Sequence, residues 1–243
     1  MDAGISEDAT NYPQRWTEMP GAKFLVLNPH PNNNWLKRTF LELKELLKHE
    51  LTRFNRVSNR TPLRIRGSWR RFVMKLLTDP DLTLRTLISA FYVFLLESKD
   101  DTLGLSLRAG LRGGSKSNQP FMVHLFTGGL LFESLLKHCY EYDDAGKRNQ
   151  TLGGIFKITS GFSRDFGTGC ANVDRKGGPL SQIHGAIQGS NSIETAFSTA
   201  ARLRNTTGHN LVWDDIFDTP NRYVDLFHQV LNAIFYVIAV KFV

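Results

Sequence analysis

An arginine and a histidine lie five positions apart in the stretch Arg204–His209, which reads Arg-Asn-Thr-Thr-Gly-His. On an unbroken helix, five steps of about 100° would place the two side chains about 140° apart. Gly208 can adopt the left-handed conformation that ends helices, and Thr206 and Thr207 have weak helix propensity, so a bend between the two is expected. The stretch therefore predicts a helix end with a permanently charged guanidinium, then a turn, then a titratable imidazole.

These side chains suit the cleavage of RNA without a metal ion, because the 2′-hydroxyl of RNA can itself attack the adjacent phosphorus. His209 can take up or deliver a proton near neutral pH, since an unperturbed histidine has a pKa of about 6.5. Arg204 can stabilise charge on the phosphate, and Asn205 can hydrogen-bond the phosphate or orient the imidazole. The expected products are a 2′,3′-cyclic phosphate and a 5′-hydroxyl, and DNA, which lacks the nucleophile, should be spared.

A structural interpretation of the same residues stays open. In that case Arg204 caps a helix or pairs with Asp214 or Asp215, and His209 only satisfies backbone groups. The other histidines show no His-x3-His spacing and no paired carboxylates, so neither a metal site nor a cofactor is predicted; they are His30, His49, His124, His138, His184 and His228.

The positive charge is concentrated in the first half of the chain. Residues 1–118 contain 19 basic and 12 acidic side chains, a net charge of +7, whereas residues 119–243 contain 11 of each. No acid interrupts the segment 51–78. A polyanion such as RNA is the simplest partner for this segment, and a solvated basic face is the alternative. The predicted RNA-binding residues are Arg53, Arg56, Arg60, Arg64, Arg66, Arg70, Arg71 and Lys75.

Apolar residues at helical spacing predict a mainly α fold. We expect helices over residues 35–54, 68–77, 82–97, 120–140 and 151–162, from a capping box of Asn191 and Glu194 to Arg204, and from Pro220 to about residue 238. Residues 91–94 could instead form a buried strand. The glycine-rich segment 161–189 is expected to be a long irregular loop. The domain organisation we predict is a basic, mostly helical region over 1–105, a Gly/Ser-rich linker over 106–118 and a helical domain over 119–243.

Composition sets the expected compartment. The two cysteines, Cys139 and Cys170, supply neither a disulfide framework nor a metal-ligand pair, and the acidic start of the chain lacks a signal-peptide core. A cytoplasmic location is therefore expected. The apolar segment 223–243 still contains several polar residues, which favours a buried helix over a membrane anchor.

The residues from about 119 to 243 resemble the HEPN family (higher eukaryotes and prokaryotes nucleotide-binding). The ribonuclease members of this family carry an Arg-x4-6-His motif, commonly with a polar residue such as asparagine after the arginine, and Arg204–His209 matches that form. The motif also precedes the final helix, as in the family. Glu133 and Lys137 are similar to a Glu-x3-Lys feature of some members, although a plain helix ion pair is the simpler reading of that spacing.

The resemblance implies a small helical bundle and a metal-independent endoribonuclease, of the kind found in toxins and antiviral defence effectors. It implies Arg204, Asn205 and His209 as catalytic residues, with Glu133 and Lys137 in support. It also implies a homodimer in which the last helices pack together and two copies of the motif share one cleft. An inhibitory or regulatory protein partner is a further expectation. The alternative functions are a non-catalytic module that binds nucleic acid or nucleotides, and an interaction protein with a solvated basic face.

Overall fold

A computed structural model describes residues 33–58, 65–78, 119–187, 190–207 and 220–243, together with residues 83–98 except 85, 89 and 97. Of these residues 79% are helical and none lies in a strand, so the predicted mainly α fold is confirmed. Residues 91–94 are helical, and the strand alternative for them is therefore wrong. The predicted linker 106–118 lies outside the described residues.

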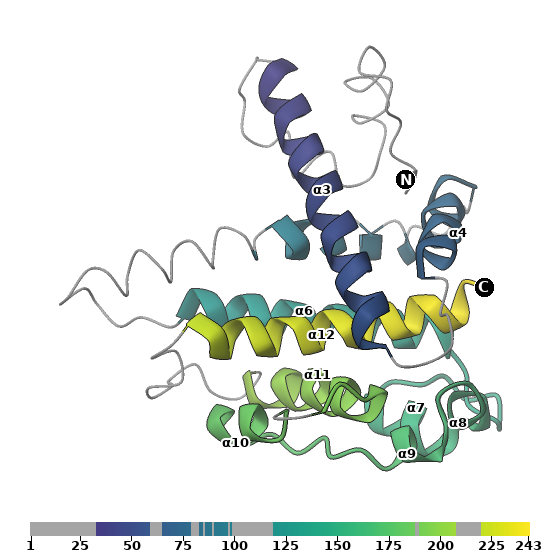
Figure 1. Ribbon diagram of the computed structural model, residues 1–243. Helices are drawn as coiled ribbons and strands as arrows, with labels where there is room; N and C mark the ends of the chain where they lie inside the picture. Colours follow the sequence, from purple (N-terminus) through teal and green to yellow (C-terminus); the bar gives the residue numbers. More distant parts are fainter. Residues whose placement is uncertain are drawn as a thin grey trace. The chain divides into compact units, whose positions relative to one another are not determined.

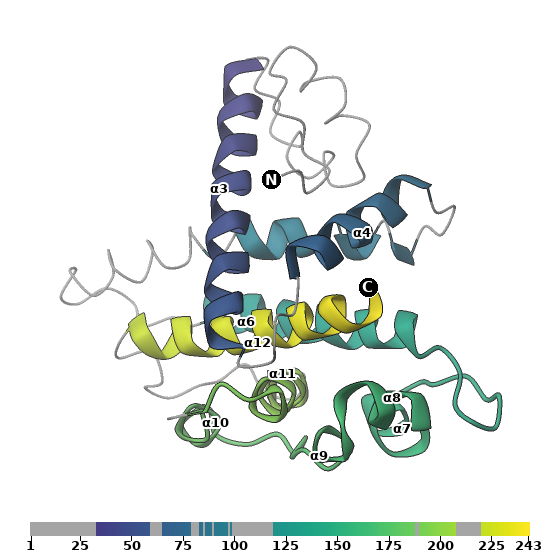
Figure 2. The ribbon, with the colours of Figure 1, turned by 45° about the vertical axis from the view of Figure 1, so that its right-hand side comes forward.

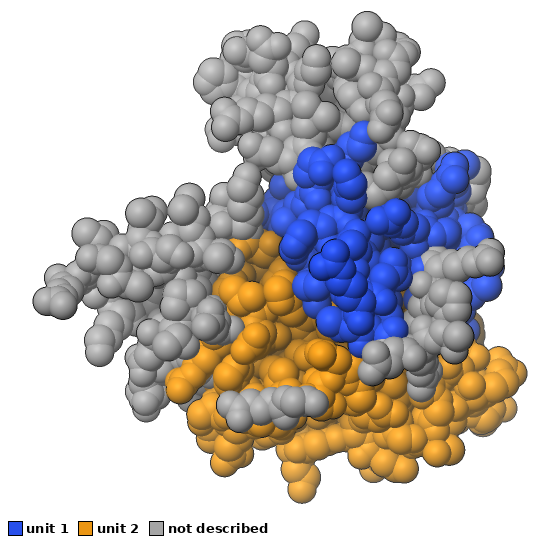
Figure 3. Space-filling model, in the orientation of Figure 1, with its two compact units in different colours: residues 1–96, 238–243 blue, residues 97–237 orange. Residues whose placement is uncertain are grey.

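The chain divides into two compact units, which Figure 3 shows in different colours. Unit 1 comprises residues 1–96 and 238–243, and unit 2 comprises residues 97–237. The last six residues thus belong with the N-terminal region, whereas the sequence suggested one helical domain that continues to residue 243.

Unit 1 contains two long amphipathic helices, α3 (Asn33–Val57) and α4 (Ile65–Thr78) (Figure 1). Apolar residues of α3 recur at helical spacing and are buried, as the sequence predicted: Leu43, Leu47, Leu51 and Phe54. The side chain of Trp69 on α4 is also buried, and its ring lies 4.9 Å from Phe91 and 5.5 Å from Phe72. An aromatic core therefore holds α4 in unit 1.

The C-terminal residues complete this core. The ring of Phe242 lies 4.7 Å from that of Phe72, edge to face. The Ser68 hydroxyl donates to the Ala239 carbonyl at 3.3 Å, and Arg71 Nε donates to the Phe242 carbonyl at 2.8 Å. Because the last carbonyls of a helix lack partners within the helix, these two donors on α4 stabilise the end of the final helix.

Unit 2 is built on α6 (Gln119–Cys139) and α11 (Ile193–Thr207), which pack closely against each other. Gly129 of α6 permits this approach, since a β-carbon at that position would lie 2.9 Å from Arg204 Cβ and 3.1 Å from the Ala200 carbonyl oxygen. The helix predicted over residues 120–140 is confirmed. The predicted capping box is wrong: Ser192 caps α11, because its hydroxyl accepts from the Thr195 amide at 3.1 Å.

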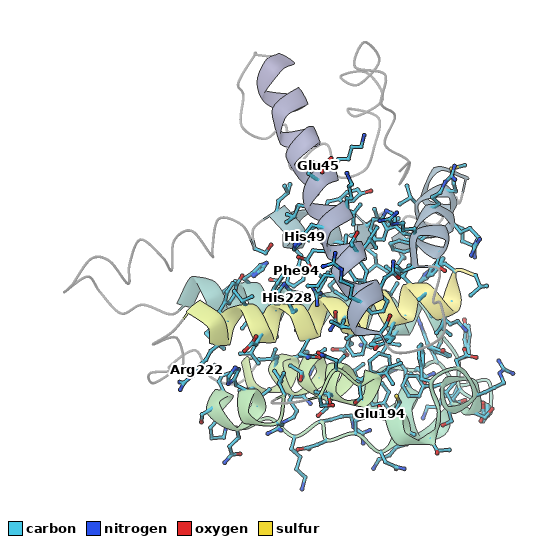
Figure 4. The ribbon with its side chains drawn as sticks, in the orientation of Figure 1. Glu45, His49, Phe94, Glu194, Arg222 and His228 are labelled. Atoms are coloured by element: carbon cyan, nitrogen blue, oxygen red, sulfur yellow. The ribbon has the colours of Figure 1, made fainter. Side chains whose placement is uncertain are left out.

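The final helix, α12 (Pro220–Lys241), begins at Pro220 as predicted and includes Arg222 and His228 (Figure 4). The side chains of Tyr223 on α12 and His124 on α6 are both buried, and the Tyr223 hydroxyl and His124 Nδ1 lie 2.6 Å apart. Figures 1 and 2 show α6 and α12 side by side in unit 2. Among the described residues, 222–241 have the length and apolar composition of a membrane span, and most of them are buried inside the protein, as in a core helix.

The described part of unit 2 also contains four short helices, of which two lie near the end of α6 and the last lies beside α11 (Figure 2). The helix predicted over 151–162 is instead α7 (Leu152–Ile158) and α8 (Ser160–Phe166), separated by an extended Thr159. Thr151 caps α7, since its Oγ1 accepts from the Gly154 amide. The segment 161–189, expected to be irregular, also includes α9 (Thr168–Ala171) and α10 (Leu180–Gly185). Apolar side chains from these short helices are buried, which offsets the poor helix propensity of glycine.

Candidate functional site

Arg204 lies in the last turn of α11, and three of its N–H groups donate hydrogen bonds. Nε donates to Glu133 Oε2 at 2.5 Å, and Nη2 donates to Glu133 Oε1 at 3.5 Å. Nη1 donates to Asn205 Oδ1 at 2.9 Å. The guanidinium is thus fixed from two sides, by a carboxylate on α6 and by the neighbouring amide.

Glu133 connects the two residue pairs that the sequence singled out. Its side chain is only 4% exposed, and Lys137 Nζ lies 2.8 Å from Glu133 Oε1 one turn further along α6. The carboxylate therefore contacts two cations from two different helices. The helix ion pair expected for Glu133 and Lys137 is present, but it belongs to a larger cluster that includes Arg204.

The cluster of Glu133, Lys137 and Arg204 retains a net charge of +1. The side chains of Lys137 and Arg204 are each 36% exposed, so water reaches both cations. A guanidinium has five N–H groups, and among the described residues only three of those on Arg204 have acceptors. Within the described residues, two donors of Arg204 and one excess positive charge are left for an anion such as a phosphate.

Asn205 links Arg204 to an extended segment that we term the strap, residues 172–179 between α9 and α10. While its Oδ1 accepts from Arg204, its Nδ2 donates to the Arg175 carbonyl at 2.6 Å. Both ends of this amide are therefore engaged. Its orientation is set by Arg204 on one side and by the strap on the other.

The strap runs beside α11 (Figure 1), and side chains of that helix hold it there. Thr206 Oγ1 accepts from the Gly178 amide at 2.9 Å, and Gly177 packs so closely that a β-carbon there would lie 3.0 Å from the same oxygen. Two more side chains of α11 donate to strap carbonyls: Ser198 to Asp174 at 2.8 Å and Arg202 to Lys176 at 3.1 Å. The strap is fixed from Asp174 to Gly178 without pairing as a strand.

An open cavity of about 780 Å³ borders Asn205. Strap residues form the rest of its lining: Asn172, Val173, Asp174, Arg175, Lys176 and Gly177. Its volume lies within the roughly 300–1,000 Å³ that is typical of small-ligand pockets. The predicted catalytic asparagine therefore stands between Arg204 and a hollow large enough for a nucleotide.

His209, the other half of the predicted motif, lies outside the described residues. So do Asp214 and Asp215, the two acids expected to pair with Arg204 if its role is structural. The described part of α11 reaches Thr207, three residues beyond the helix end expected at Arg204, and the rest of the stretch to His209 lies outside the described residues. The structure brings Arg204, Asn205, Glu133 and Lys137 together and leaves the position of the imidazole untested.

The eight predicted RNA-binding residues of unit 1 fall into three groups. Four make contacts within the unit: Arg53 Nε donates to Glu50, Arg66 to Thr52 Oγ1 at 3.1 Å, Arg71 to the Phe242 carbonyl, and Lys75 lies 5.6 Å from the Phe242 ring centre. Arg56 and Arg70 are exposed, and no described residue pairs with their side chains. Arg60 and Arg64 lie outside the described residues. Of the six predicted RNA-binding residues that the structure describes, Arg56 and Arg70 are thus the best placed for an external anion.

Several contacts near the site involve residues that the sequence did not single out. Arg175 and Lys176 belong to the strap that borders the site, and only the unusual length of the glycine-rich segment pointed to them. His184 Nε2 lies 2.9 Å from Asp225 Oδ2, a pairing between α10 and α12 that sequence spacing does not reveal. In the described part of the chain, no three side chains among His, Cys, Asp and Glu gather as metal ligands would.

Comparisons with protein-family models, with curated proteins and with solved structures found no match to this chain.

Proposed function

We propose that this protein is a metal-independent endoribonuclease with Arg204, Asn205 and His209 at its active site. The observation that supports the proposal is the convergence of Arg204 and Asn205 with Glu133 and Lys137 at the end of α11. The two residue pairs lie 71 positions apart, at Arg204 and Glu133. They were selected because they resemble two separate HEPN motifs. Their direct contact is what a shared site requires.

In this proposal the 2′-oxygen of the ribose forms a bond to phosphorus while the bond from phosphorus to the 5′-oxygen breaks. A base takes the proton of the 2′-hydroxyl, and an acid protonates the departing 5′-oxygen. Arg204 stabilises the negative charge on the phosphate oxygens through its two remaining N–H donors. Glu133 holds the guanidinium in place, and Lys137 keeps the cluster positive.

The Arg204–His209 motif supplies one imidazole, and therefore one acid or base, per chain, so the proposal includes a homodimer. Two copies of His209 in one cleft would provide both proton-transfer groups. Arg56 and Arg70 would contribute to binding RNA outside the active site. A role in a toxin system or in antiviral defence, with a regulatory partner, follows only from the family resemblance.

The test is cleavage of a single-stranded RNA in EDTA by the wild-type protein and by variants. We expect 2′,3′-cyclic phosphate and 5′-hydroxyl ends, and no cleavage when a 2′-deoxynucleotide replaces the one at the cut. Arg204→Ala should lower the rate about 10²- to 10³-fold, and His209→Ala about 10²- to 10⁴-fold. Arg204→Lys keeps the charge but loses the planar fork, and should recover only part of the activity.

Arg164→Ala is the matched control, because Arg164 is an exposed arginine of unit 2 whose side chain is 80% exposed. It should cleave as the wild type does. Cleavage by Arg204→Ala at the wild-type rate, with folding verified by circular dichroism, would exclude the proposed active site.

A non-catalytic RNA-binding module is the second candidate, and one contact favours it. The guanidinium of Arg204 is already paired with a buried carboxylate, as in an arginine whose role is structural. This candidate predicts that the wild-type protein binds RNA with a strong salt dependence and does not cut it in EDTA or in Mg²⁺.

A further inference from the structure

The cavity between the strap and Asn205 has no role in the chemistry proposed above. It is open and measures about 780 Å³, and one of its walls is the asparagine that also bonds Arg204. An RNA substrate continues on both sides of the phosphate that is cut. The nucleotide next to that phosphate must therefore contact the protein surface beside Arg204 and Asn205.

The walls of the cavity are held in a defined shape. Three side chains of α11, those of Ser198, Arg202 and Asn205, donate to successive carbonyls of the strap. Gly177 rests against the backbone of Thr206, where a β-carbon would lie 3.2 Å from both Thr206 N and Cα. A preformed surface of this kind binds a ligand without having to be ordered first.

The charges of the strap favour an anion. Asp174 is compensated, because one carboxylate oxygen accepts from the Lys176 amide at 2.9 Å and the other lies 3.7 Å from Arg202 Nε. The Arg175 guanidinium lies 5.3 Å from the centre of the Phe156 ring and donates to the Ala171 carbonyl. Lys176 is exposed, and in the described part of the chain no side chain pairs with its ammonium group.

We propose that this cavity is a nucleotide subsite. It binds the nucleotide of single-stranded RNA that is adjacent to the scissile phosphate, and Lys176 contacts the phosphate of that nucleotide. The inference rests on the proposed ribonuclease function, because Asn205 connects the two sites. Arg175, fixed on Phe156, adds positive charge at the same wall. Asn172 and Val173 provide a polar and an apolar contact for the base or ribose.

The test measures binding separately from cleavage. The probe is a fluorescent single-stranded RNA of twelve uridines whose 2′-hydroxyls are replaced by 2′-O-methyl groups, so that it cannot be cut, titrated by anisotropy at several salt concentrations. Lys176→Ala should bind about threefold to fivefold more weakly, the effect of one exposed ion pair. The slope of log Kd against log salt should fall by about 0.7, as for one lost phosphate contact on a single strand. Lys176→Arg should restore both values.

Lys157→Ala is the matched control, since Lys157 is an exposed lysine on α7 that does not line the cavity. It should leave the affinity and the slope unchanged. A 4-thiouridine version of the probe should crosslink to a peptide that contains residues 172–177.

The outcomes separate the two proposals. If Lys176→Ala keeps the wild-type slope, or if no crosslink maps to residues 172–177, the subsite is excluded even when the wild type cuts RNA. If the salt slope of Lys176→Ala falls as predicted and the crosslink forms, but the wild type does not cut unmodified RNA, the subsite is supported and the proposed nuclease activity is excluded. A wild-type protein that does not bind the probe overturns the subsite.

Discussion

Gly129 of α6 lies directly against the backbone of Arg204. A β-carbon at position 129 would be 2.9 Å from Arg204 Cβ and 3.2 Å from Arg204 Cα. Helices usually approach to about 8–10 Å between axes, depending on the side chains at the contact, and a glycine at the crossing allows the closest packing. The position of the guanidinium therefore depends on the absence of a side chain on the neighbouring helix.

Gly129→Ala should destabilise the protein and impair the site together. The cost of overpacking, about 1–3 kcal/mol, exceeds the roughly 1 kcal/mol that alanine gains over glycine inside a helix. We expect the free energy of unfolding in urea to fall by up to about 2 kcal/mol, with loss of RNA cleavage. Gly185→Ala is the control, because a β-carbon at Gly185 would meet nothing within 4 Å. Equal stability of the two variants would show that α6 can move away at no cost.

Glu133→Gln should weaken both the fold and the proposed activity. The buried carboxylate contacts Lys137 and Arg204, and a neutral amide would turn an N–H group toward one of these cations. Since the cations are partly exposed, we expect the free energy of unfolding in urea to fall by about 1–3 kcal/mol, less than when one partner of a fully buried pair is removed. The matched variant is Glu141→Gln, whose carboxylate is 47% exposed and lies 3.5 Å from Arg148 Nε. The free energy of unfolding of that variant should lie within about 0.5 kcal/mol of the wild-type value.

Tyr140 makes the stability of the protein sensitive to alkaline pH. Burial raises the pKa of its hydroxyl above the usual value, and the hydrogen bond to Asp165 at 2.7 Å raises the pKa further. Burial also raises the pKa of Tyr92. The folded protein thus keeps these protons at pH values where an unfolded tyrosine, with a pKa of about 10, loses them. Stability is complete below about pH 10 and falls above it, by up to about 1.4 kcal/mol per pH unit for each tyrosine.

Tyr140→Phe removes the hydrogen bond to Asp165, so its free energy of unfolding at pH 7 should be about 1 kcal/mol lower than that of the wild type. Between about pH 10 and 11 its free energy of unfolding should decline less steeply with pH. Urea unfolding across this pH range measures both effects. Tyr142→Phe, at a tyrosine that is 55% exposed, is the control for the substitution at pH 7. An unchanged alkaline slope in Tyr140→Phe would contradict the raised pKa.

Adjacent arginines of α4 should have separable effects. Arg71→Ala removes a donor to the Phe242 carbonyl at the end of α12, and should lower the free energy of unfolding by about 1–2 kcal/mol. Arg70→Ala should leave stability unchanged, while reducing the salt slope of RNA binding by about 0.7. Parallel urea and anisotropy measurements compare the two variants. Identical behaviour of both in RNA binding would argue against a defined basic surface on α4.

The long helices could be predicted from sequence because each buries one apolar face, and Leu43, Leu47 and Leu51 on α3 show that pattern directly. The helices α9 and α10 could not be predicted in this way. Glycines at positions 167, 169 and 185 are typical of a loop, and these short helices are stabilised by the burial of Cys170 and Ile183 in tertiary packing.

The candidate site was predictable in its members but not in its contacts. Glu133 and Arg204 were chosen separately, by resemblance to two motifs, and nothing in local sequence shows that they touch. The count of charges selected both Arg70 and Arg71 as RNA-binding residues. The structure distinguishes them, because Arg71 donates a hydrogen bond to the Phe242 carbonyl. The strap could not be predicted, because side chains of another segment hold it in place.

The way in which the strap is held has a consequence for the order of folding. In the described part of the chain, residues 173–178 form no backbone-to-backbone hydrogen bonds, and the partners of their backbone groups outside the strap are side chains of α11. Those partners are in position only after the helix has formed. Residues 173–178 should therefore become ordered late in folding, and their amides should be among the first in unit 2 to exchange with solvent deuterium.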